Sequence, residues 1–396
     1  DRLEVGERLP VDIFIMDSGV LKPLFNKGMI FSRIAQSIIH EKGVSEVYVP
    51  VEQRSALATL GSVSSRRKEG SFLEDPIAFK NYSYTKDKYF QIERNVLVPD
   101  TKVSFSIYSL ERLNFRLIAE ASDAAPITLD NRIINASGDL CILNTDVPRY
   151  NEYLQMLSEE KHLPAENVSS VKALIIKENA KVIMKELLDD PRSGQTIKKT
   201  ERVVTTMIDS ILANKETIYD LVSLKQYDYY TYTHSVNVAV LSIGLAVAIK
   251  LDRTQVELLG MGALLHDIGK SAIPAEILNK QGKLDDREYL IIKSHVVEGE
   301  KILRANLDIS DKALPAALQH HEKISGRGYP LGLKGSEISL FGRIAAIADC
   351  YDALTTRRPY KAPMTPFYAL SIIAKETGDY DPELLKVFIK MLGKIQ

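Results

Sequence analysis

The second half of the sequence carries apolar residues at helical spacing, with no strand signal between them. This change of character begins at about residue 165. Proline, glycine and capping aspartate or threonine residues bound each segment. The residues from 165 onwards therefore predict an all-α fold. The expected helices span 168–190, 195–214, 229–250, 253–268, 285–304, 311–322, 337–356, 365–377 and 382–392.

This helical half is expected to contain two parts. Residues 156–224 are predicted to form a helical linker or stalk, and residues 225–396 an all-α domain. The first two helices could pack as an antiparallel pair or form a signalling stalk that dimerises, and the sequence does not decide between them. The apolar run 236–249 is shorter than the ~20 residues of a membrane-spanning helix, so it predicts a fully buried helix.

The first half alternates short β-rich runs with polar turns, which predicts a mixed α/β module over residues 1–155. We expect this module to be regulatory or sensor-like. Helical stretches such as 31–43 lie between the strands, and residues 31–53 and 129–150 could form a weak internal repeat. The expected strands span 11–16, 44–50, 95–99, 102–110 and 140–144.

Composition limits the setting and the partners of the protein. The 51 lysine and arginine residues nearly balance the 52 aspartate and glutamate residues, so no overall field favours a nucleic-acid polymer or a membrane surface. An anionic ligand must therefore be held locally. The two cysteines, Cys141 and Cys350, form no CxxC pair, which is typical of a reducing compartment. With no visible signal peptide, a cytoplasmic location is expected.

Histidine is scarce, with seven in 396 residues, yet five of them fall between residues 234 and 321. The segment HDIGK, 266–270, ends an apolar helix, so His266 and Asp267 are expected to point into the core. Burial of an unpaired carboxylate costs several kcal/mol, and a metal ion offsets that cost. The other candidate ligands lie on separate expected helices: His234, His295, His320, His321 and Asp349.

These residue types indicate a transition-metal site. Neutral imidazoles with carboxylates suit Fe or Mn, with Ni, Co or Zn as alternatives, and the lack of paired thiolates argues against a closed structural zinc site. Seven ligands are too many for one open tetrahedral site, so two divalent ions bridged by Asp267 are expected. A lone core histidine is more often bonded to a carbonyl, but the clustering outweighs that reading. His40 and His162 are interpreted as surface residues and Cys350 as core filler.

From about residue 225 to 390 the chain resembles the HD-GYP branch of the HD superfamily of metal-dependent phosphohydrolases. The resemblance depends on five ordered segments: HDIGK, SHVVEGEKIL, HHE, GYP and ADCYDALTTRRPYK. It implies an all-helical, HD-type domain with a bimetallic or trimetallic centre. It also implies hydrolysis of cyclic di-GMP to pGpG or GMP through a metal-activated hydroxide.

Roles carried over by the resemblance fall on matching positions. His234, His266, Asp267 and Asp349 would hold one metal, and Asp267, His295, His320 and His321 the other. Lys270 matches the catalytic lysine of the family, and its ammonium could neutralise charge on the phosphate. Arg358 and Lys361 match its phosphate-contacting pair. Gly328 and Tyr329 belong to a tight loop, closed by Pro330, that is expected to shape the entrance and contact substrate.

Two positions depart from the family pattern. Three-metal members carry a glutamate four residues before the first histidine, where this chain has Tyr230. A two-metal centre is therefore expected, and Tyr230 could line the site. Ser325 stands where the family has an aspartate. That change puts loop docking and substrate choice in question more than metal binding.

The leading hypothesis is a regulated cyclic-dinucleotide phosphodiesterase that acts on cyclic di-GMP. One alternative is a catalytically weak receptor that binds the dinucleotide and signals through partners. Another is a hydrolase of a different cyclic dinucleotide. Signalling proteins that dock on the GYP loop or the N-terminal module, and a second copy of the chain, are the further partners considered.

Overall fold

The computed structural model describes residues 13–17, 20–25, 88–111, 114–159, 168–214, 217–222, 231–278, 280, 283–356, 364–376 and 378–393. The chain forms two compact units, Asp1–Tyr84 and Thr85–Gln396. In the first unit, β1 (Ile13–Asp17) and β2 (Val20–Phe25) pair as an antiparallel hairpin. The strand expected over 44–50, the helix over 31–43 and one half of the proposed repeat lie outside the described residues. His40 and His162 lie outside them as well.

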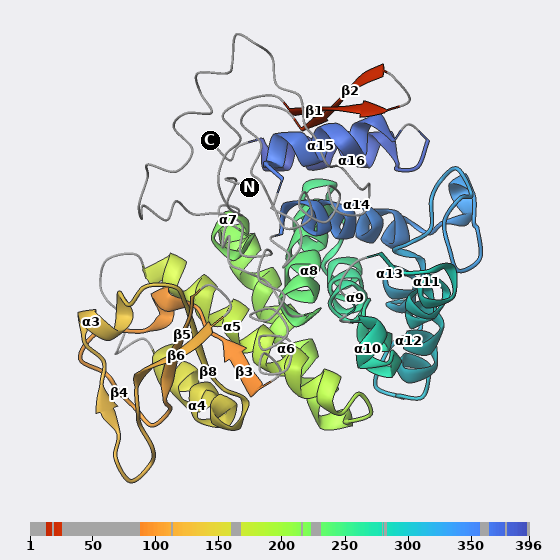
Figure 1. Ribbon diagram of the computed structural model, residues 1–396. Coiled ribbons are helices and arrows are strands. Elements are labelled where there is room, and N and C mark those ends of the chain that lie inside the picture. Colours follow the sequence, from red (N-terminus) through yellow and green to blue (C-terminus); the bar gives the residue numbers. More distant parts are fainter. Residues whose placement is uncertain are drawn as a thin grey trace. The chain divides into compact units, whose positions relative to one another are not determined.

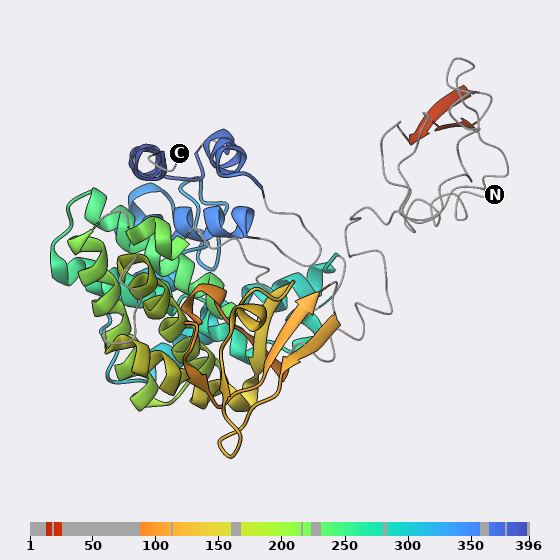
Figure 2. The same ribbon diagram turned by 90° about the vertical axis from the view of Figure 1, so that its left-hand side faces the viewer.

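The second unit begins with a four-stranded antiparallel sheet in the order β3-β8-β5-β6. Its strands bury Phe90, Ile107 and Ile142 completely on the face towards the helices. Figure 2 shows this sheet standing beside the helical part of the same unit. The elements of this region are β3 (Tyr89–Gln91), β4 (Lys102–Val103), β5 (Ile107–Glu111), β6 (Asn114–Ala119), β7 (Ile127–Thr128), α3 (Asn131–Ile134), β8 (Asp139–Leu143) and α4 (Val147–Ser158).

The expected strand over 95–99 is wrong, because Arg94–Val96 forms the 3-10 helix η4. The Glu93 side chain caps this turn by accepting a hydrogen bond from the Asn95 amide at 3.3 Å. The strand expected over 102–110 is divided into β4 and β5. Between them, the Ser106 hydroxyl accepts from the Ala121 amide at 3.0 Å and donates to its carbonyl at 3.1 Å, contacts that lie outside a strand ladder.

Two long helices connect the sheet to the rest of the unit. Helix α5 (Val168–Asp189) and helix α6 (Gly194–Ala213) pack against each other across a short turn. Helix α5 also packs against α4, α7 (Thr217–Val222) and α8 (Thr231–Ala248). It buries residues on several faces, so it is an internal helix of this unit.

The remaining helices form a bundle around α8, whose apolar run is buried from Val236 to Ala246. The expectation of full burial over 236–249 is wrong at the C-terminal end of the run, where Ala248 is exposed. Helices α9, α14 and α16 pack directly on α8 (Figure 1). Among the described residues, no helix is long and apolar enough to cross a membrane. The bundle comprises α9 (Arg253–Leu264), η6 (Ile268–Ala272), α10 (Ala275–Leu278), α11 (Asp286–Lys293), α12 (His295–Arg304), α13 (Leu314–Gln319), η7 (Gly335–Glu337), α14 (Leu340–Thr355), α15 (Pro366–Lys375) and α16 (Pro382–Leu392).

Two expected helices end earlier than the sequence pattern indicates. The helix expected over 253–268 stops at Leu264, so His266 and Asp267 lie in a turn before η6. The helix expected over 285–304 is divided at Ser294, and His295 becomes the first residue of α12. Both interruptions lie where candidate ligands stand, so the ligands project from helix ends.

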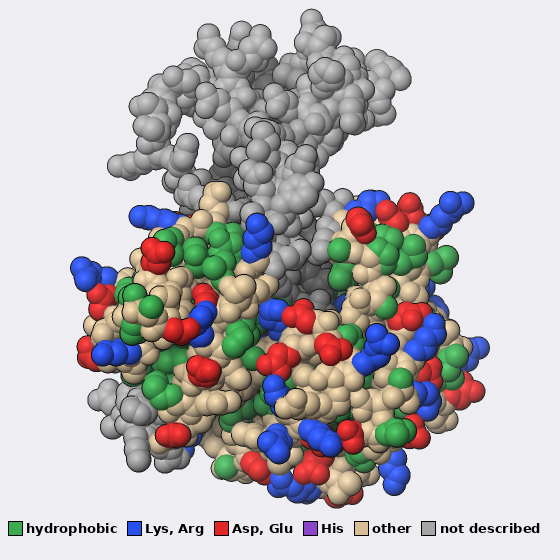
Figure 3. All heavy atoms as spheres, turned by 90° about the horizontal axis from the view of Figure 1, so that it is seen from below, with side chains coloured by type: hydrophobic (Ala, Val, Ile, Leu, Met, Phe, Trp, Pro, Cys, Tyr) green, Lys and Arg blue, Asp and Glu red, His purple; other side chains and the backbone are tan. Residues whose placement is uncertain are grey.

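The described surface agrees with the balanced composition. On the face in Figure 3, basic and acidic side chains are interspersed and neither sign gathers into a large patch over the described atoms. Cys141 is a buried free thiol on β8, and Cys350 is a partly buried free thiol that packs against the core. The interpretation of Cys350 as core filler is confirmed.

Candidate metal centre

Seven imidazole and carboxylate side chains from five parts of the bundle meet at one place. Four of them are at most 2 % exposed, so the centre lies inside the protein and not on its surface. Helix α8 carries His234, the turn after α9 carries His266 and Asp267, α12 begins with His295, the residues after α13 are His320 and His321, and α14 carries Asp349.

Two glycines allow these elements to approach each other closely. A Cβ atom on Gly262 would lie 2.1 Å from the backbone oxygen of Ala313, so α9 packs tightly against the start of α13. A Cβ atom on Gly269 would lie 1.9 Å from the backbone oxygen of His295, so η6 packs tightly against α12. Only glycine fits at either position.

The first candidate ligand group consists of His234, His266 and Asp267. The Nε2 atoms of the two histidines lie 3.3 Å apart. Asp267 Oδ2 lies 3.3 Å from His266 Nε2 and 3.7 Å from His234 Nε2. Asp349 Oδ1 approaches the same group, at 3.0 Å from His234 Nε2. These four side chains form the set expected for one metal ion.

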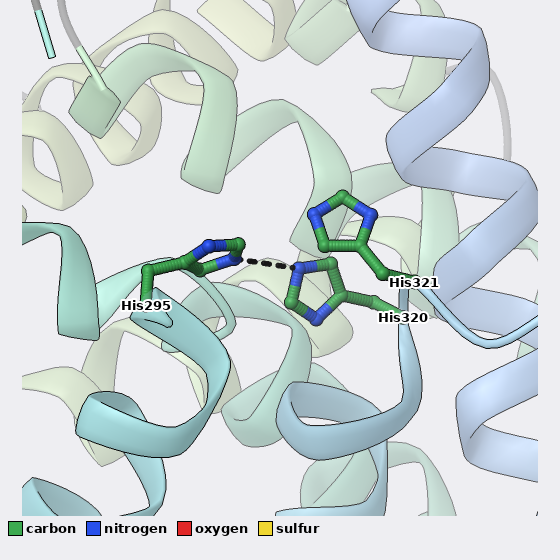
Figure 4. A group of neighbouring side chains, drawn as sticks. All are labelled: His295, His320 and His321. Atoms are coloured by element: carbon green, nitrogen blue, oxygen red, sulfur yellow. Dashed lines mark hydrogen bonds between the residues drawn. The ribbon is translucent and has the colours of Figure 1, made fainter. Parts of the chain in front are cut away.

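The second candidate ligand group consists of His295, His320 and His321. Figure 4 shows His295 facing the adjacent pair His320 and His321 from the opposite side, and the Nε2 atoms of His295 and His320 are 3.3 Å apart. The other oxygen of Asp267, Oδ1, lies 3.4 Å from His295 Nε2. Asp267 therefore turns one oxygen towards each group, which is the arrangement of a bridging carboxylate.

Hydrogen bonds to the outer nitrogen fix how each imidazole is oriented. The Nδ1 atoms of His266, His295 and His320 lie 2.7 Å from the carbonyl oxygens of Ala263, Ile292 and Ala317. A carbonyl oxygen can only accept, so each Nδ1 carries the proton and each Nε2 lone pair faces the centre. Such outer partners are typical of metal-bound histidines.

This donor set fits a divalent cation on structural grounds. The Nε2 lone pairs of His295 and His320 face each other at 3.3 Å, where neither atom has a proton to donate. A cation between these two nitrogens removes the repulsion. A cation beside Asp267, between His234 and His266, has the same effect in the first ligand group. Imidazole nitrogens and carboxylate oxygens are ordinary ligands of Mn, Fe, Co, Ni and Zn.

The electrostatics of the histidines also favour a cation. Burial lowers the pKa of His320 well below its ordinary range and the pKa of His321 to about 3, so both rings are neutral and free to coordinate. His234 behaves differently. Burial opposes its charged form, but hydrogen bonds to Asp349 and Asp352 outweigh burial and raise its pKa to about 10. The two carboxylates beside His234 therefore favour positive charge at this place.

The carboxylates at the centre are ionised. Burial opposes the charge of Asp267, but Lys270 and His266 outweigh it and hold its pKa well below the ordinary value. Lys270 Nζ donates to Asp267 Oδ2 at 2.5 Å. Burial is likewise outweighed at Asp349, where His234 and His321 keep the pKa well below normal. The structure thus pairs Lys270 with the carboxylate that lies between the two groups.

The glycine-rich loop lies against the second ligand group. A Cβ atom on Gly328 would lie 2.4 Å from the Lys323 amide nitrogen, so the loop folds back on the residues after His321 only because this position is glycine. The Tyr329 ring stacks on the His321 ring with centroids 4.6 Å apart. Tyr329 is therefore part of the wall beside the candidate ligands.

Glu322, the glutamate of the HHE segment, holds this loop in place. Its side chain is 1 % exposed and accepts hydrogen bonds from the backbone amides of Leu331 at 2.7 Å and Leu333 at 2.9 Å. The sequence analysis gave no role to Glu322. Its position directly after the candidate ligands His320 and His321 could have indicated a role near the centre.

Ser325, the departure from the family pattern, meets a carboxylate from elsewhere in the chain. Its hydroxyl donates to Asp379 Oδ1 at 2.6 Å, and Arg327 Nη2 donates to the same oxygen at 2.8 Å. The Ile324 amide donates to the Asp379 carbonyl at 3.0 Å. Asp379, which precedes α16, therefore places a carboxylate beside Ser325, where the family pattern has an aspartate.

Asp352 is a second residue that the sequence analysis did not single out. It lies one helical turn after Asp349 on α14, is buried, and accepts from His234 Nδ1 at 2.7 Å and from Asn237 Nδ2 at 2.8 Å. Its spacing from Asp349 could have indicated it. The expected substrate contacts Tyr230, Arg358 and Lys361 lie outside the described residues.

Comparisons with known proteins agree with the family resemblance of the helical half. Residues 216–384 match the HD domain family. A solved structure, the HDG"Y"P protein Bd1817 from Bdellovibrio bacteriovorus, shares the fold at a TM-score of 0.59 and 20 % identity, over 77 % of this chain and 99 % of that chain. The HDIGK, HHE and GYP segments make this part of the chain similar to the HD-GYP branch of that family.

Curated relatives match about half of the chain. A cyclic di-GMP phosphodiesterase of Pseudomonas aeruginosa, PA4108, is 38 % identical over 223 residues, which are 56 % of this chain and 54 % of the relative. A cyclic di-GMP phosphodiesterase of Thermotoga maritima is 37 % identical over 201 residues, 50 % of this chain and 54 % of the relative. The 3'3'-cGAMP-specific phosphodiesterase 2 of Vibrio cholerae is 35 % identical over 190 residues, 47 % of this chain and 36 % of the relative. This chain spans about half the length of the first two of these relatives.

Proposed function

We propose that this protein is a metal-dependent phosphodiesterase that hydrolyses cyclic di-GMP to pGpG, GMP or both. The observation that carries the proposal is the pair of ligand groups with Asp267 between them. The relatives named as cyclic di-GMP phosphodiesterases support the choice of substrate. Because this chain spans about half of each of them, the activity is assigned as a proposal.

The site is suited to in-line displacement at phosphorus. A pair of divalent ions in such a centre polarises phosphoryl oxygens and lowers the pKa of water at the site. The protein's own contribution is to hold seven donors in place through buried hydrogen bonds and to keep Asp267 ionised. The Tyr329 ring and the loop held by Glu322 bound one side of the centre, which limits where a phosphodiester can enter.

Lys270 is proposed as the catalytic cation. Its ammonium lies beside Asp267 and is partly exposed, so it can contact both the bridging carboxylate and a bound phosphate. A fixed positive charge at this place stabilises the negative charge that develops on the phosphate oxygens. Arg358 and Lys361 are proposed to grip phosphate on the strength of the family pattern, and Gly328, Tyr329 and Tyr230 to line the site.

Fe or Mn are the proposed metals, with Ni, Co or Zn as alternatives. Five imidazoles and two carboxylates form a donor set of intermediate softness, which these ions prefer over Mg or Ca. The nearest sulfur in sequence, Cys350, has no place in either ligand group. Two ions are proposed because the donors divide into two groups that share one carboxylate.

The N-terminal module of residues 1–155 is proposed to regulate the domain of residues 225–396. The GYP loop and the N-terminal module are the proposed docking places for signalling proteins, and a homodimer in the cytoplasm is the proposed setting. A second candidate substrate, a mixed cyclic dinucleotide, is favoured by the relatives named as 3'3'-cGAMP-specific phosphodiesterases. A receptor without turnover is disfavoured by the Asp379 carboxylate, which compensates for Ser325.

Incubation of the metal-counted protein with cyclic di-GMP and with 3'3'-cGAMP, followed by separation of the products, tests this proposal. Formation of pGpG or GMP from cyclic di-GMP supports it, and Asp267→Ala should abolish both metal loading and turnover. Lys270→Met should lower turnover while the metal content stays at the wild-type level. Tight binding of either dinucleotide without product would identify a receptor instead.

A further inference from the structure

Lys293, near the end of α11, is a lysine without an acidic partner. Among the described residues, its ammonium makes no hydrogen bond and no ion pair. Other lysines of this region are paired with carboxylates. Lys280 donates to Glu288 at 2.5 Å, in front of the same helix. Lys301 on α12 donates to Glu298 at 2.6 Å. The charge of Lys293 is therefore not used by an ion pair of the fold.

Two tyrosine rings surround the ammonium of Lys293 instead. Its Nζ atom lies 4.6 Å from the centre of the Tyr289 ring and 4.9 Å from the centre of the Tyr329 ring. Tyr289 precedes Lys293 by four positions on α11, so the two side chains share one face of the helix. Tyr329 belongs to the GYP loop. Cation–π contacts hold an ammonium in place and leave its N–H donors available to a ligand.

This ammonium lies close to the second ligand group. The Tyr329 ring that it contacts is stacked on the ring of His321, with 4.6 Å between the centroids. Two steps of 4.9 Å and 4.6 Å therefore lead from Lys293 to a candidate metal ligand, a span comparable with one nucleotide. Tyr289 is 49 % exposed and Lys293 is half-buried. Both side chains are thus open to a ligand that enters the centre from solvent.

Helix α11 holds the two side chains at a fixed place beside the centre. Asp285 and Glu288 form a capping box that sets where the helix begins. The helix ends at Ser294, and His295 follows directly as the first residue of α12. Lys293 thus stands two positions before a candidate ligand. None of the residues of α11 is buried, so the helix contributes a rim to the centre and not a part of the core.

A nucleobase fits this arrangement better than a phosphate group does. The phosphodiester of the proposed substrate belongs beside the ligand groups and Lys270, where metal ions act on it. Purine bases stack on aromatic faces, which offer nothing comparable to a phosphate. An ammonium beside such a face can donate to acceptor atoms at the edge of the base. Guanine presents two acceptors there, O6 and N7, whereas adenine presents N7 beside an amino donor.

We propose that Tyr289 and Lys293 form a guanine subsite at the rim of the metal centre. The exposed Tyr289 ring stacks on one base of the bound dinucleotide, and Lys293 donates to O6 and N7 of that base. Lys293 is therefore a specificity-determining residue that favours guanine over adenine. The inference rests on the proposed function, because the base belongs to the cyclic dinucleotide whose phosphodiester is hydrolysed. It adds base recognition, which the ligand groups do not provide.

The test compares Lys293→Met with the wild-type protein on cyclic di-GMP and on cyclic di-AMP. Methionine keeps the length of the side chain without its donors. For cyclic di-GMP, kcat/KM should fall on the order of 10-fold, and for cyclic di-AMP by less than about 2-fold. The metal content should stay at the wild-type level. Lys293→Arg should keep the preference for guanine, because a guanidinium also donates to O6 and N7. Tyr289→Leu should raise KM for both dinucleotides, because every base has a face that stacks.

Lys301→Met is the matched control, because Lys301 is an exposed lysine of the next helix whose charge is paired with Glu298. It should leave kcat/KM for both dinucleotides within about 2-fold of wild type, since exposed ion pairs contribute little. Three results for Lys293→Met would each overturn the inference: unchanged kinetics, an equal loss for both dinucleotides, or a loss of bound metal.

Failure of the proposed function gives a different result. If the wild-type protein hydrolyses neither dinucleotide, the proposed activity is wrong. Binding of slowly hydrolysed phosphorothioate analogues of cyclic di-GMP and cyclic di-AMP then decides the inference. A preference for the guanine analogue that Lys293→Met abolishes supports the subsite, and equal affinity of the wild-type protein for the two analogues overturns it.

Discussion

Gly269→Ala tests whether the close approach of η6 and α12 positions the metal centre. The added Cβ would lie 1.9 Å from the His295 carbonyl oxygen and 2.4 Å from the Gly299 amide nitrogen, and both are backbone atoms that cannot rotate away. To reach the ordinary contact distance of 3.4 Å, the two elements must separate by about 1.5 Å. Element η6 follows Asp267 and carries Lys270, and helix α12 begins with His295.

The expected effect has two parts. Overpacking of this kind lowers the free energy of unfolding by about 1–3 kcal/mol, which lowers Tm by roughly 2–10 °C. A displacement near 1 Å at a reacting centre costs on the order of 100-fold in rate. We therefore expect reduced metal content and about 100-fold lower phosphodiesterase activity in protein that is still folded at room temperature. Thermal unfolding, metal analysis and product separation measure the three quantities.

Gly194→Ala is the matched control. Its added Cβ meets nothing closer than the Asp308 carboxylate at 3.6 Å, and the position is the first residue of α6. Alanine is favoured over glycine in helices by up to about 1 kcal/mol, so this variant should be at least as stable as wild type with full activity. The reasoning is refuted by a Gly269→Ala protein that keeps wild-type Tm, metal content and rate.

Three further predictions concern the loop, the metals and Lys177, a buried lysine on α5. Glu322→Gln should lower the free energy of unfolding by about 1–3 kcal/mol, because the new NH₂ group faces a backbone N–H donor. It should also raise KM while the metal content stays unchanged. An unchanged KM would show that the loop does not need this carboxylate. Removal of metal by a chelator should lower Tm, and Mn²⁺ at 100 times its Kd should restore about 2.7 kcal/mol of stability; a Tm indifferent to metal would contradict the centre. Burial lowers the pKa of Lys177 from 10.5 to about 8, so between pH 8 and 10.5 the unfolded chain binds more protons at this group than the folded chain. Stability should therefore rise across this window in wild type relative to Lys177→Met, as denaturant unfolding at several pH values will measure.

The positions of the candidate histidines could be predicted because histidine is rare in this chain and these histidines lie near helix ends. What the sequence could not show is how the rings are oriented. His266, His295 and His320 each donate Nδ1–H to a backbone carbonyl three residues earlier, and every residue type carries such a carbonyl. Ring orientation therefore depends on where the helix stops, and helix ends are the least certain part of a sequence pattern.

The errors elsewhere have similar physical causes. The branched apolar side chains of residues 95–99 predict a strand, but the Glu93 side chain stabilises a turn there instead. Asp379 lies more than fifty positions after Ser325, so the contact that links them could not be inferred from either segment alone.

The internal position of α5 limits how this protein can be divided. A fragment that starts at residue 225 would strip α8 of helix α5, which packs against it. Any transfer of the bundle to another protein must therefore carry α5 and α6 along with it. The natural cut for such a graft falls before the sheet, near the junction of the two compact units at Tyr84 and Thr85.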